Sequence, residues 1–125
     1  MFSENMLGPL EADIMLIIWK RQLVTVHDVY EELLENRSIA YNTVMTVMTR
    51  LARKGILHRQ KKGRSYLYYP GVTKSEVARS MFQYVIDKIY GGSRVMVLSH
   101  LINDKTLRDY ELDYLKAIVR KKNAK

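Results

Sequence analysis

The sequence predicts a mainly α-helical fold that contains one small β-hairpin. Apolar residues recur with a helical period in three stretches before residue 55. Between residues 56 and 69, short runs rich in strand-favouring Tyr replace that period. The helical period returns after Pro70 and is broken by Gly91 and Gly92. The expected order is therefore three helices, a hairpin and three further helices.

The first two helices are expected at residues 9–21 and 26–36. Pro9 suits a first helical turn, where its missing N–H removes no hydrogen bond, and apolar residues follow it at helical spacing. Thr25 precedes the second helix, and Asp28 three residues later completes the pattern of a capping box. Each of the two helix starts therefore has its own local signal.

The third helix is expected within YNTVMTVMTRLARKG, residues 41–55, where Gly55 is suited to end it. One face is an apolar stripe and is expected to be buried: Val44, Val47, Met48 and Leu51. The other face consists of Asn42, Met45, Thr46, Thr49, Arg50 and Arg53. Thr is a poor choice for solubility alone, because it costs up to about 0.7 kcal/mol relative to Ala in a helix. We therefore expect this face to contact a partner.

The hairpin is expected from two runs, residues 56–61 and 65–69, joined by Lys62, Gly63 and Arg64. After it, Thr73-Lys74-Ser75-Glu76 reads as a capping box.

Three helical segments are expected after the hairpin. A long helix is expected at residues 74–90, a short and almost wholly apolar segment at residues 95–98, and a last helix at residues 107–121.

Composition excludes several classes of protein. The chain has no Cys, which excludes disulfides, thiolate metal ligands and a thiol nucleophile. The longest apolar run, from Ile14 to Trp19, is far shorter than the roughly 20 residues that cross a bilayer. Residues 1–13 lack the basic and apolar regions of a signal peptide. We therefore expect a cytoplasmic protein with no membrane partner.

The net charge of +8 is concentrated in the central third of the chain. No Asp or Glu occurs between Asn36 and Ser75, whereas nine basic residues do; the rest of the chain holds 12 basic and 13 acidic residues. Charge that only kept the protein soluble would be mixed in sign, so this segregation indicates a polyanionic partner, and a merely basic surface patch is the alternative.

Three helices followed by a two-stranded hairpin form a winged helix-turn-helix DNA-binding domain, expected at residues 1–72, in which the third helix reads the major groove. The expected base contacts are Asn42, Thr43, Met45 and Thr46, which offer an amide, hydroxyls and an apolar surface for a thymine methyl. The expected backbone contacts are Tyr41, Thr49, Arg50, Arg53, Lys61, Lys62 and Arg64.

Several of these residues have an alternative role. Thr43 could hydrogen-bond at the helix start, Tyr41 could be a partly exposed core aromatic, and Met45 could be buried. The cations at the hairpin tip could belong to a solvated turn, although a position beside the third helix favours contact with the DNA backbone or minor groove.

Residues 73–125 are expected to form a helical dimerisation domain. The helix at residues 74–90 has an apolar stripe too wide for one helix on a small core, so a second chain is the expected partner. The expected dimer-interface residues are Val77, Met81, Phe82, Val85, Ile89, Val95, Leu98, Leu115 and Ile118. A two-fold dimer suits a palindromic site.

No enzymatic site is expected. His27, His58 and His100 are far apart in sequence and lack the spacing of metal ligands. The Gly91-Gly92 pair lacks the following Gly-Lys-Ser/Thr of a phosphate-binding loop. We therefore expect no catalytic residue, no metal and no cofactor.

The segments LGPLEADIMLIIW, IAYNTVMTVMTRLARKGIL and GRSYLYYP, with the Gly91-Gly92 break, resemble the BlaI/MecI/CopY family of penicillinase repressors. The resemblance covers about residues 7–119 and implies a homodimeric winged-helix repressor that binds an inverted-repeat operator, often of antibiotic-resistance or metal-efflux genes. Carried onto matching positions, it implies base contacts by Asn42, Thr43, Met45 and Thr46. It implies backbone contacts by Tyr41, Arg50 and the wing.

The chain departs from the family pattern in two places. Copper-responsive members use a Cys-rich C-terminal motif, which a chain without Cys cannot supply. The β-lactamase-linked members are inactivated by cleavage of an Asn-Phe bond after the Gly-Gly break, where this chain has Ser99 and His100 as the candidate cleavage position. A sensor-linked protease is therefore a candidate partner only if it accepts a different bond.

The expected function is sequence-specific repression of transcription by a homodimer on a palindromic operator of double-stranded DNA, with antibiotic-resistance or stress genes as targets. Two alternatives stay open. The basic face could bind an acidic protein, or a pocket at the dimer interface could bind a small molecule that regulates the protein.

Overall fold

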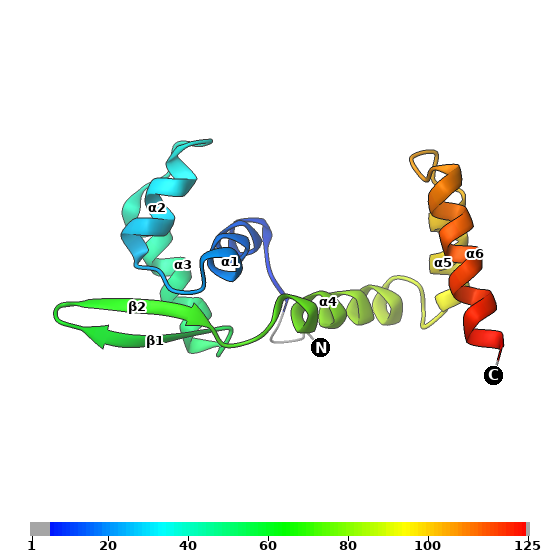
Figure 1. The fold of residues 1–125 in the computed structure, drawn as a ribbon. Coiled ribbons are helices and arrows are strands. Elements are labelled where there is room, and N and C mark those ends of the chain that lie inside the picture. The colour runs from blue at the N-terminus through cyan, green and yellow to red at the C-terminus, as the bar shows by residue number, and fades with distance from the viewer. Residues whose placement is uncertain (1–5, 125) are drawn as a thin grey trace. The chain divides into compact units, whose positions relative to one another are not determined.

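The computed structural model describes residues 6–124 and forms two compact units, one ending at Gln83 and the other beginning at Tyr84. The elements follow the expected order (Figure 1): α1 (Pro9–Arg21), α2 (Val26–Leu34), α3 (Tyr41–Arg53), β1 (Leu57–Lys62), β2 (Ser65–Pro70), α4 (Lys74–Lys88), α5 (Arg94–Ile102) and α6 (Asp109–Asn123). The mainly helical fold with one hairpin is therefore confirmed. The domain boundary between residues 72 and 73 stays a prediction.

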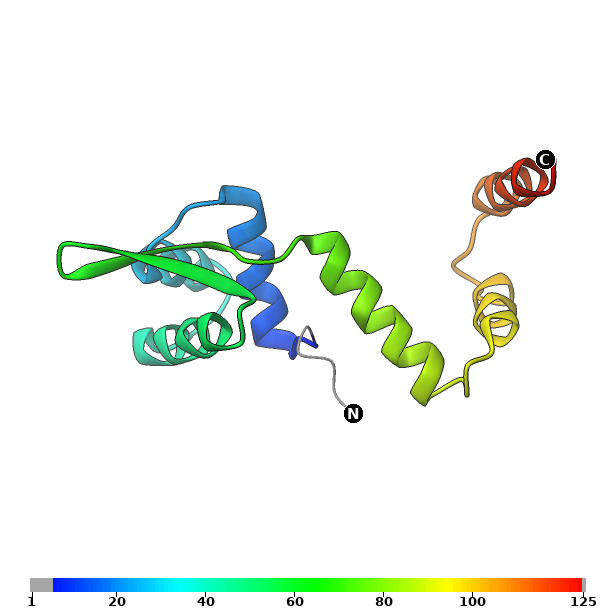
Figure 2. The ribbon, with the colours of Figure 1, turned by 90° about the horizontal axis from the view of Figure 1, so that it is seen from below.

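The first unit is built around one apolar core. In two views α1, α2 and α3 gather beside the base of the hairpin, whose tip extends beyond them (Figures 1 and 2). Helical spacing brings the apolar stripes of the three helices together, and the ends of the strands nearest the helices close the core. Its fully buried side chains include Ile14, Met15, Ile18, Val24, Val29, Val44, Met48, Leu51, Ile56 and Leu57.

The base of the hairpin is attached to the helices by backbone hydrogen bonds. Val24, in the segment between α1 and α2, exchanges two N–H···O=C bonds with Tyr68 of β2, at 3.0 and 2.7 Å. Trp19 of α1 donates its indole N–H to the carbonyl of Val72, just after β2, at 3.0 Å. The hairpin is therefore fixed at its base, and its tip extends from that base.

The turn of the hairpin is one residue shorter than predicted. Lys62 pairs with Ser65, so the turn has two residues, Gly63 and Arg64, instead of the three that were predicted. Gly63 has φ +62°, and a two-residue hairpin turn favours positive φ because it matches the twist of the strands. The first strand accordingly begins and ends one residue later than predicted, at Leu57–Lys62. The second begins at Ser65 as predicted and ends one residue later, at Pro70.

Two helix starts were predicted from capping boxes, and the structure confirms both. Thr25 and Asp28 exchange hydrogen bonds at the start of α2, and Thr73 and Glu76 do so before α4. Each helix begins directly after its capping Thr, at Val26 for α2 and at Lys74 for α4.

The predicted helix ends are less accurate. Helix α2 ends at Leu34 instead of residue 36, because Glu35 already bonds back to Glu32 in a turn. Helix α4 ends at Lys88 instead of residue 90. The apolar segment at residues 95–98 is the middle of a longer helix, α5. Helix α6 runs from Asp109 to Asn123 instead of residues 107–121, because Glu111 accepts the N–H of Arg108 and so sets its start.

The second unit buries little of its apolar surface. Among its described residues only Ile86 and Val97 are buried, and α6 contains no buried residue. Ten large apolar or aromatic side chains from Ile89 to Val119 are exposed. Within residues 6–124, no helix combines the length and the apolar character that a membrane span needs.

Candidate nucleic-acid interface

Helix α3 divides into the two faces that its sequence predicts. Val44, Val47, Met48 and Leu51 are buried, as expected of the apolar stripe. On the other face six side chains are exposed and Thr49 is half-buried; the exposed ones are Asn42, Thr43, Met45, Thr46, Arg50 and Arg53. Met45 is 41% exposed, so the alternative that it belongs to the core is wrong. The predicted base-reading side chains therefore share one accessible helix face.

The start of α3 is open to an anionic group. Ala40 is the N-cap residue, no side chain caps this end, and the first turn contains no acidic residue. The N–H of Thr43 bonds to the carbonyl of Ala40, so its backbone, and not its hydroxyl, makes the hydrogen bond at the helix start. An uncapped N-terminus carries partial positive charge and attracts phosphate.

Tyr41 packs against the helical core and also stays accessible, and its contact with the DNA backbone stays a prediction. Its ring packs edge-on against Tyr30 of α2, with centroids 5.4 Å apart and planes at 77°, while 41% of the residue stays exposed. The ring is thus held by aromatic packing, and Tyr41 remains accessible at the start of α3.

Arg50 and Lys54 are held by a carboxylate that the sequence did not single out. Glu11 of α1 is 8% exposed, and its Oε2 atom lies 3.6 Å from Arg50 Nε and 3.5 Å from Lys54 Nζ. Its Oε1 atom accepts the N–H of Gly8 at 2.9 Å. Burial raises the pKa of Glu11, but the Gly8 N–H, Lys54 and Arg50 outweigh it, so the pKa lies below its ordinary value.

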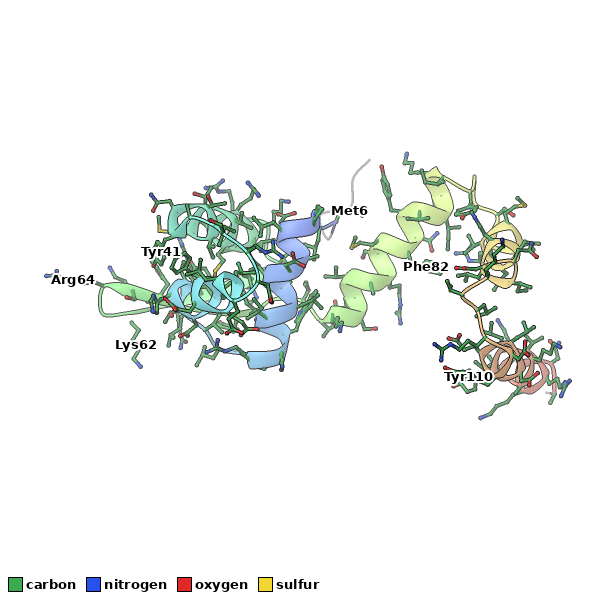
Figure 3. All side chains as sticks on the ribbon, turned by 90° about the horizontal axis from the view of Figure 1, so that it is seen from above. Met6, Tyr41, Lys62, Arg64, Phe82 and Tyr110 are labelled. Atoms are coloured by element: carbon green, nitrogen blue, oxygen red, sulfur yellow. The ribbon has the colours of Figure 1, made fainter. Side chains whose placement is uncertain are left out.

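The hairpin, or wing, presents cations that no carboxylate neutralises. Lys61, Lys62 and Arg64 are exposed, and none of them pairs with an acidic residue in the part of the chain that is described. Lys62 and Arg64 lie at the free end of the hairpin (Figure 3). Charges placed in this way are available for phosphate.

Arg59 is a wing residue that the sequence prediction missed. Its guanidinium lies 4.2 Å above the centroid of the Tyr66 ring, and its Nη1 atom donates to the Tyr68 hydroxyl at 3.3 Å. These contacts depend on the strand register, which brings Tyr68 opposite Arg59. One Arg in the first strand and Tyr at alternate positions 66 and 68 of the second were the available signal, but sequence alone did not give the register.

A shallow depression joins the face of α3 to the wing. Its lining residues come from α3 and β1: Thr49, Ala52, Arg53, Leu57, His58 and Arg59. Two predicted backbone contacts, Thr49 and Arg53, therefore meet two residues that were not predicted, His58 and Arg59. The depression thus brings Arg53 of α3 and Arg59 of β1 to one part of the surface.

The three histidines occupy separate places. His27 lies 3.6 Å from Glu31 in α2, His58 packs against Tyr69, and His100 Nδ1 lies 2.7 Å from the Tyr90 hydroxyl. Within residues 6–124, no three His, Asp or Glu side chains form a group that could hold a metal ion.

The predicted dimer-interface residues differ in exposure. Val77 is 3% exposed, so it is already covered within the single chain, and Met81 and Leu115 are half-buried. The other six are exposed: Phe82, Val85, Ile89, Val95, Leu98 and Ile118. Ser99 and His100, at the candidate cleavage position, lie inside α5.

Comparison with known sequences identifies one family. The family model described as "Penicillinase repressor" matches residues 7–121. The penicillinase repressor of Bacillus licheniformis is 31% identical over 96 residues, which are 76% of this chain and 75% of that protein. The methicillin resistance regulatory protein MecI of Mammaliicoccus sciuri is 28% identical over 112 residues, 90% of this chain and 91% of that protein.

Comparison with solved structures agrees with the sequence match. The solution structure of the DNA-binding domain of the repressor BlaI has a TM-score of 0.54 and 29% identity, and covers 61% of this chain and 93% of that chain. The monomeric form of B. licheniformis BlaI in complex with the blaP half-operator has a TM-score of 0.51 with the same identity and coverage. The winged helix-turn-helix fold is therefore confirmed, and the chain belongs to the penicillinase repressor family.

Proposed function

We propose that this member of the penicillinase repressor family represses transcription as a homodimer bound to a palindromic DNA operator. One observation carries the proposal: the exposed face of α3, with its Asn, Thr and Met side chains, adjoins a wing whose cations Lys61, Lys62 and Arg64 pair with no carboxylate among residues 6–124. Residues 37–74 contain no Asp or Glu, so nothing in this segment repels a phosphate. The likeness to a BlaI form in complex with a half-operator supports the same reading.

The first half of α3 would read bases. Asn42 offers an amide that can pair with adenine, and Thr43 and Thr46 offer hydroxyls. Met45 offers an apolar surface to the methyl group of thymine. All four side chains are exposed on the helix, so a major groove could receive them together.

The second half of α3 and the wing would hold the phosphate backbone. Arg50 and Arg53 follow the base-reading residues along the helix, and Lys61, Lys62 and Arg64 extend the cationic surface along the hairpin. Tyr41 and Thr49 would add hydroxyl donors at either end of the helix. The depression between α3 and β1 makes these contacts continuous.

The exposed apolar side chains after Gln83 would be covered by a second copy of the chain. Val85, Ile89, Val95, Leu98 and Ile118 are exposed there, and many exposed large apolar side chains in one unit favour an interface. A two-fold dimer would place its two α3 helices on half-sites separated by whole turns of DNA, roughly 34 Å each.

The regulated genes and the location follow from the relatives. Relatives are named for penicillinase and methicillin resistance, so we infer an antibiotic-resistance gene as the target class. We infer a cytoplasmic location, because an operator-binding repressor has to reach the chromosome. If a sensor-linked protease cuts between Ser99 and His100, α5 must first unfold locally, since proteases cut exposed loops more readily than helices.

A salt titration tests the nucleic-acid proposal. After selection of bound duplexes from a random pool, the affinity for the selected duplex is measured by fluorescence anisotropy at several salt concentrations. If each subunit neutralises about four phosphates, the slope of log affinity against log salt should be near −7 for the dimer. A flat response, or preferential binding to an acidic protein over the duplex, would overturn the proposal.

A second measurement tests the dimer separately. Analytical ultracentrifugation should give twice the chain mass for the wild type. Ile89→Lys, which places a charge on an exposed apolar position, should shift the population toward monomer. A wild-type protein that stays monomeric at micromolar concentration would contradict the dimer while leaving DNA binding open to the salt test.

A further inference from the structure

The ion cluster of Glu11, Arg50 and Lys54 lies where α1 begins and α3 ends. One nearly buried carboxylate faces two cations, so the cluster keeps an excess of one positive charge. The start of α1 adds the partial positive charge of a helix N-terminus. Because Glu11 is shared between two cations, it neutralises only one of their two charges, and the cluster stays cationic.

The geometry of the pair leaves part of Arg50 available. Glu11 Oε2 lies 3.6 Å from Arg50 Nε, the guanidinium nitrogen that is attached to the aliphatic part of the Arg50 side chain. The Arg50 side chain is 46% exposed, and within residues 6–124 its only ion pair is with Glu11. A guanidinium that is attracted to a carboxylate through Nε, at a distance longer than a hydrogen bond, can still direct its two terminal nitrogens at one phosphate, in the two-pronged arrangement that Arg prefers.

Glu11 is itself held in place from the other side. Its Oε1 atom accepts the Gly8 N–H at 2.9 Å, as the second half of the capping arrangement at the start of α1. The carboxylate thus has one oxygen on the backbone of α1 and the other directed at α3. Movement of Arg50 is limited by a group that is anchored to the folded core.

We propose that Glu11 is a positioning residue for DNA binding, which holds Arg50 by Nε so that its terminal nitrogens face a backbone phosphate. This inference rests on the proposed function and adds a residue of α1 to it. Lys54, on the same Oε2 atom, supplies the excess charge that makes the cluster attractive to the phosphate.

Glu11→Gln separates positioning from simple charge. Gln can still accept the Gly8 N–H, as capping boxes use Glu or Gln, but it has no charge with which to hold Arg50. The variant gains one positive charge, so Coulomb attraction alone predicts tighter DNA binding. Positioning predicts weaker binding, by about twofold to fivefold per subunit, or roughly 0.4–1 kcal/mol, because the Arg50 side of the pair is exposed to solvent.

The matched control is Asp13→Asn in the same helix. Asp13 pairs with Arg37, outside the α3 face, so its removal gives the same charge change without touching Arg50. Affinity of the full chain is measured by anisotropy on a duplex of about 30 base pairs, long enough for two half-sites. Circular dichroism at the same temperature verifies that each variant is folded, and affinities are expressed per folded protein.

A double-mutant cycle with Arg50→Gln supplies a readout that a merely structural role would not give. Glu11→Gln should weaken binding and make the salt slope shallower by about one per subunit, and it should have no further effect in the Arg50→Gln background. Glu11→Gln binding as tightly as Asp13→Asn, or losing affinity equally with and without Arg50, overturns the inference alone. A wild type that binds no duplex overturns the proposed function as well.

Discussion

Removing the Tyr68 hydroxyl should loosen the wing by a measurable amount. Tyr68 is 2% exposed, and its hydroxyl accepts a hydrogen bond from Arg59 Nη1 at 3.3 Å. Tyr68→Phe keeps the buried ring and the backbone bonds to Val24, so it removes only this side-chain contact. Arg59 is exposed and can turn to water, which limits the loss to about 1 kcal/mol of unfolding free energy.

The assay is urea unfolding followed by Trp fluorescence. Trp19 is the single Trp of the chain and hydrogen-bonds to Val72, so its emission reports on the unit that contains the hairpin. For a unit of this size, about 1 kcal/mol corresponds to a fall in Tm of roughly 4–8 °C.

Tyr66 provides the matched control. Tyr66→Phe keeps the ring beneath Arg59 and should leave the unfolding free energy unchanged, whereas Tyr66→Leu removes the cation–π contact and should lower it by about 0.5–1 kcal/mol. Equal stability of Tyr68→Phe and Tyr66→Phe would refute the assignment of a stabilising role to the Arg59 hydrogen bond.

Three further outcomes are expected. Met45→Ala should change the base preference in a selection from random duplexes, whereas Lys62→Ala should weaken all duplexes alike; equal and sequence-independent losses would remove Met45 from the base-reading set. Gly71→Ala should lower the unfolding free energy by about 1–3 kcal/mol, because a Cβ there would overlap the carbonyl oxygen of Gly55, and an unchanged urea midpoint would contradict this. Folding lowers the pKa of Glu11, so the stability that its carboxylate contributes is complete above the ordinary carboxyl pKa and is lost as the pH falls through the lower pKa of the folded state. Acid titration should therefore show a smaller loss of stability below about pH 4 in Glu11→Gln than in the wild type.

The fold could be predicted from the sequence wherever the signal is local. The buried face of α3 follows from apolar spacing alone, and the starts of α2 and α4 follow from Thr-x-x-acid caps whose two hydrogen bonds lie within four residues. Helix ends were predicted less well, because the last turn is stabilised by backbone bonds that most residues can make. The hairpin turn was predicted one residue too long for a related reason: its length depends on turn geometry set by Gly63.

The candidate site was predictable in its composition and not in its internal contacts. Segregated charge and short polar residues on one helix face pointed to the surface of α3 and the wing. The role of Glu11 was hidden because its partners lie about 40 residues away in sequence, and Arg59 was hidden because its position depends on strand pairing. Long-range contacts of this kind come from tertiary packing, which no local pattern encodes.

The attachment of the hairpin only at its base separates two properties of the molecule. Val24 and Tyr68 join the base to the helices, so substitutions there change the stability of the whole unit. Residues 61–65 at the tip are all exposed and contribute no residue to the core. If the tip holds the DNA backbone as proposed, its charge can be increased, reduced or reversed to tune the strength of DNA binding, while the unfolding free energy stays nearly constant. One short hairpin thus allows affinity to vary independently of stability, which makes its tip the natural place to engineer a tighter or weaker repressor.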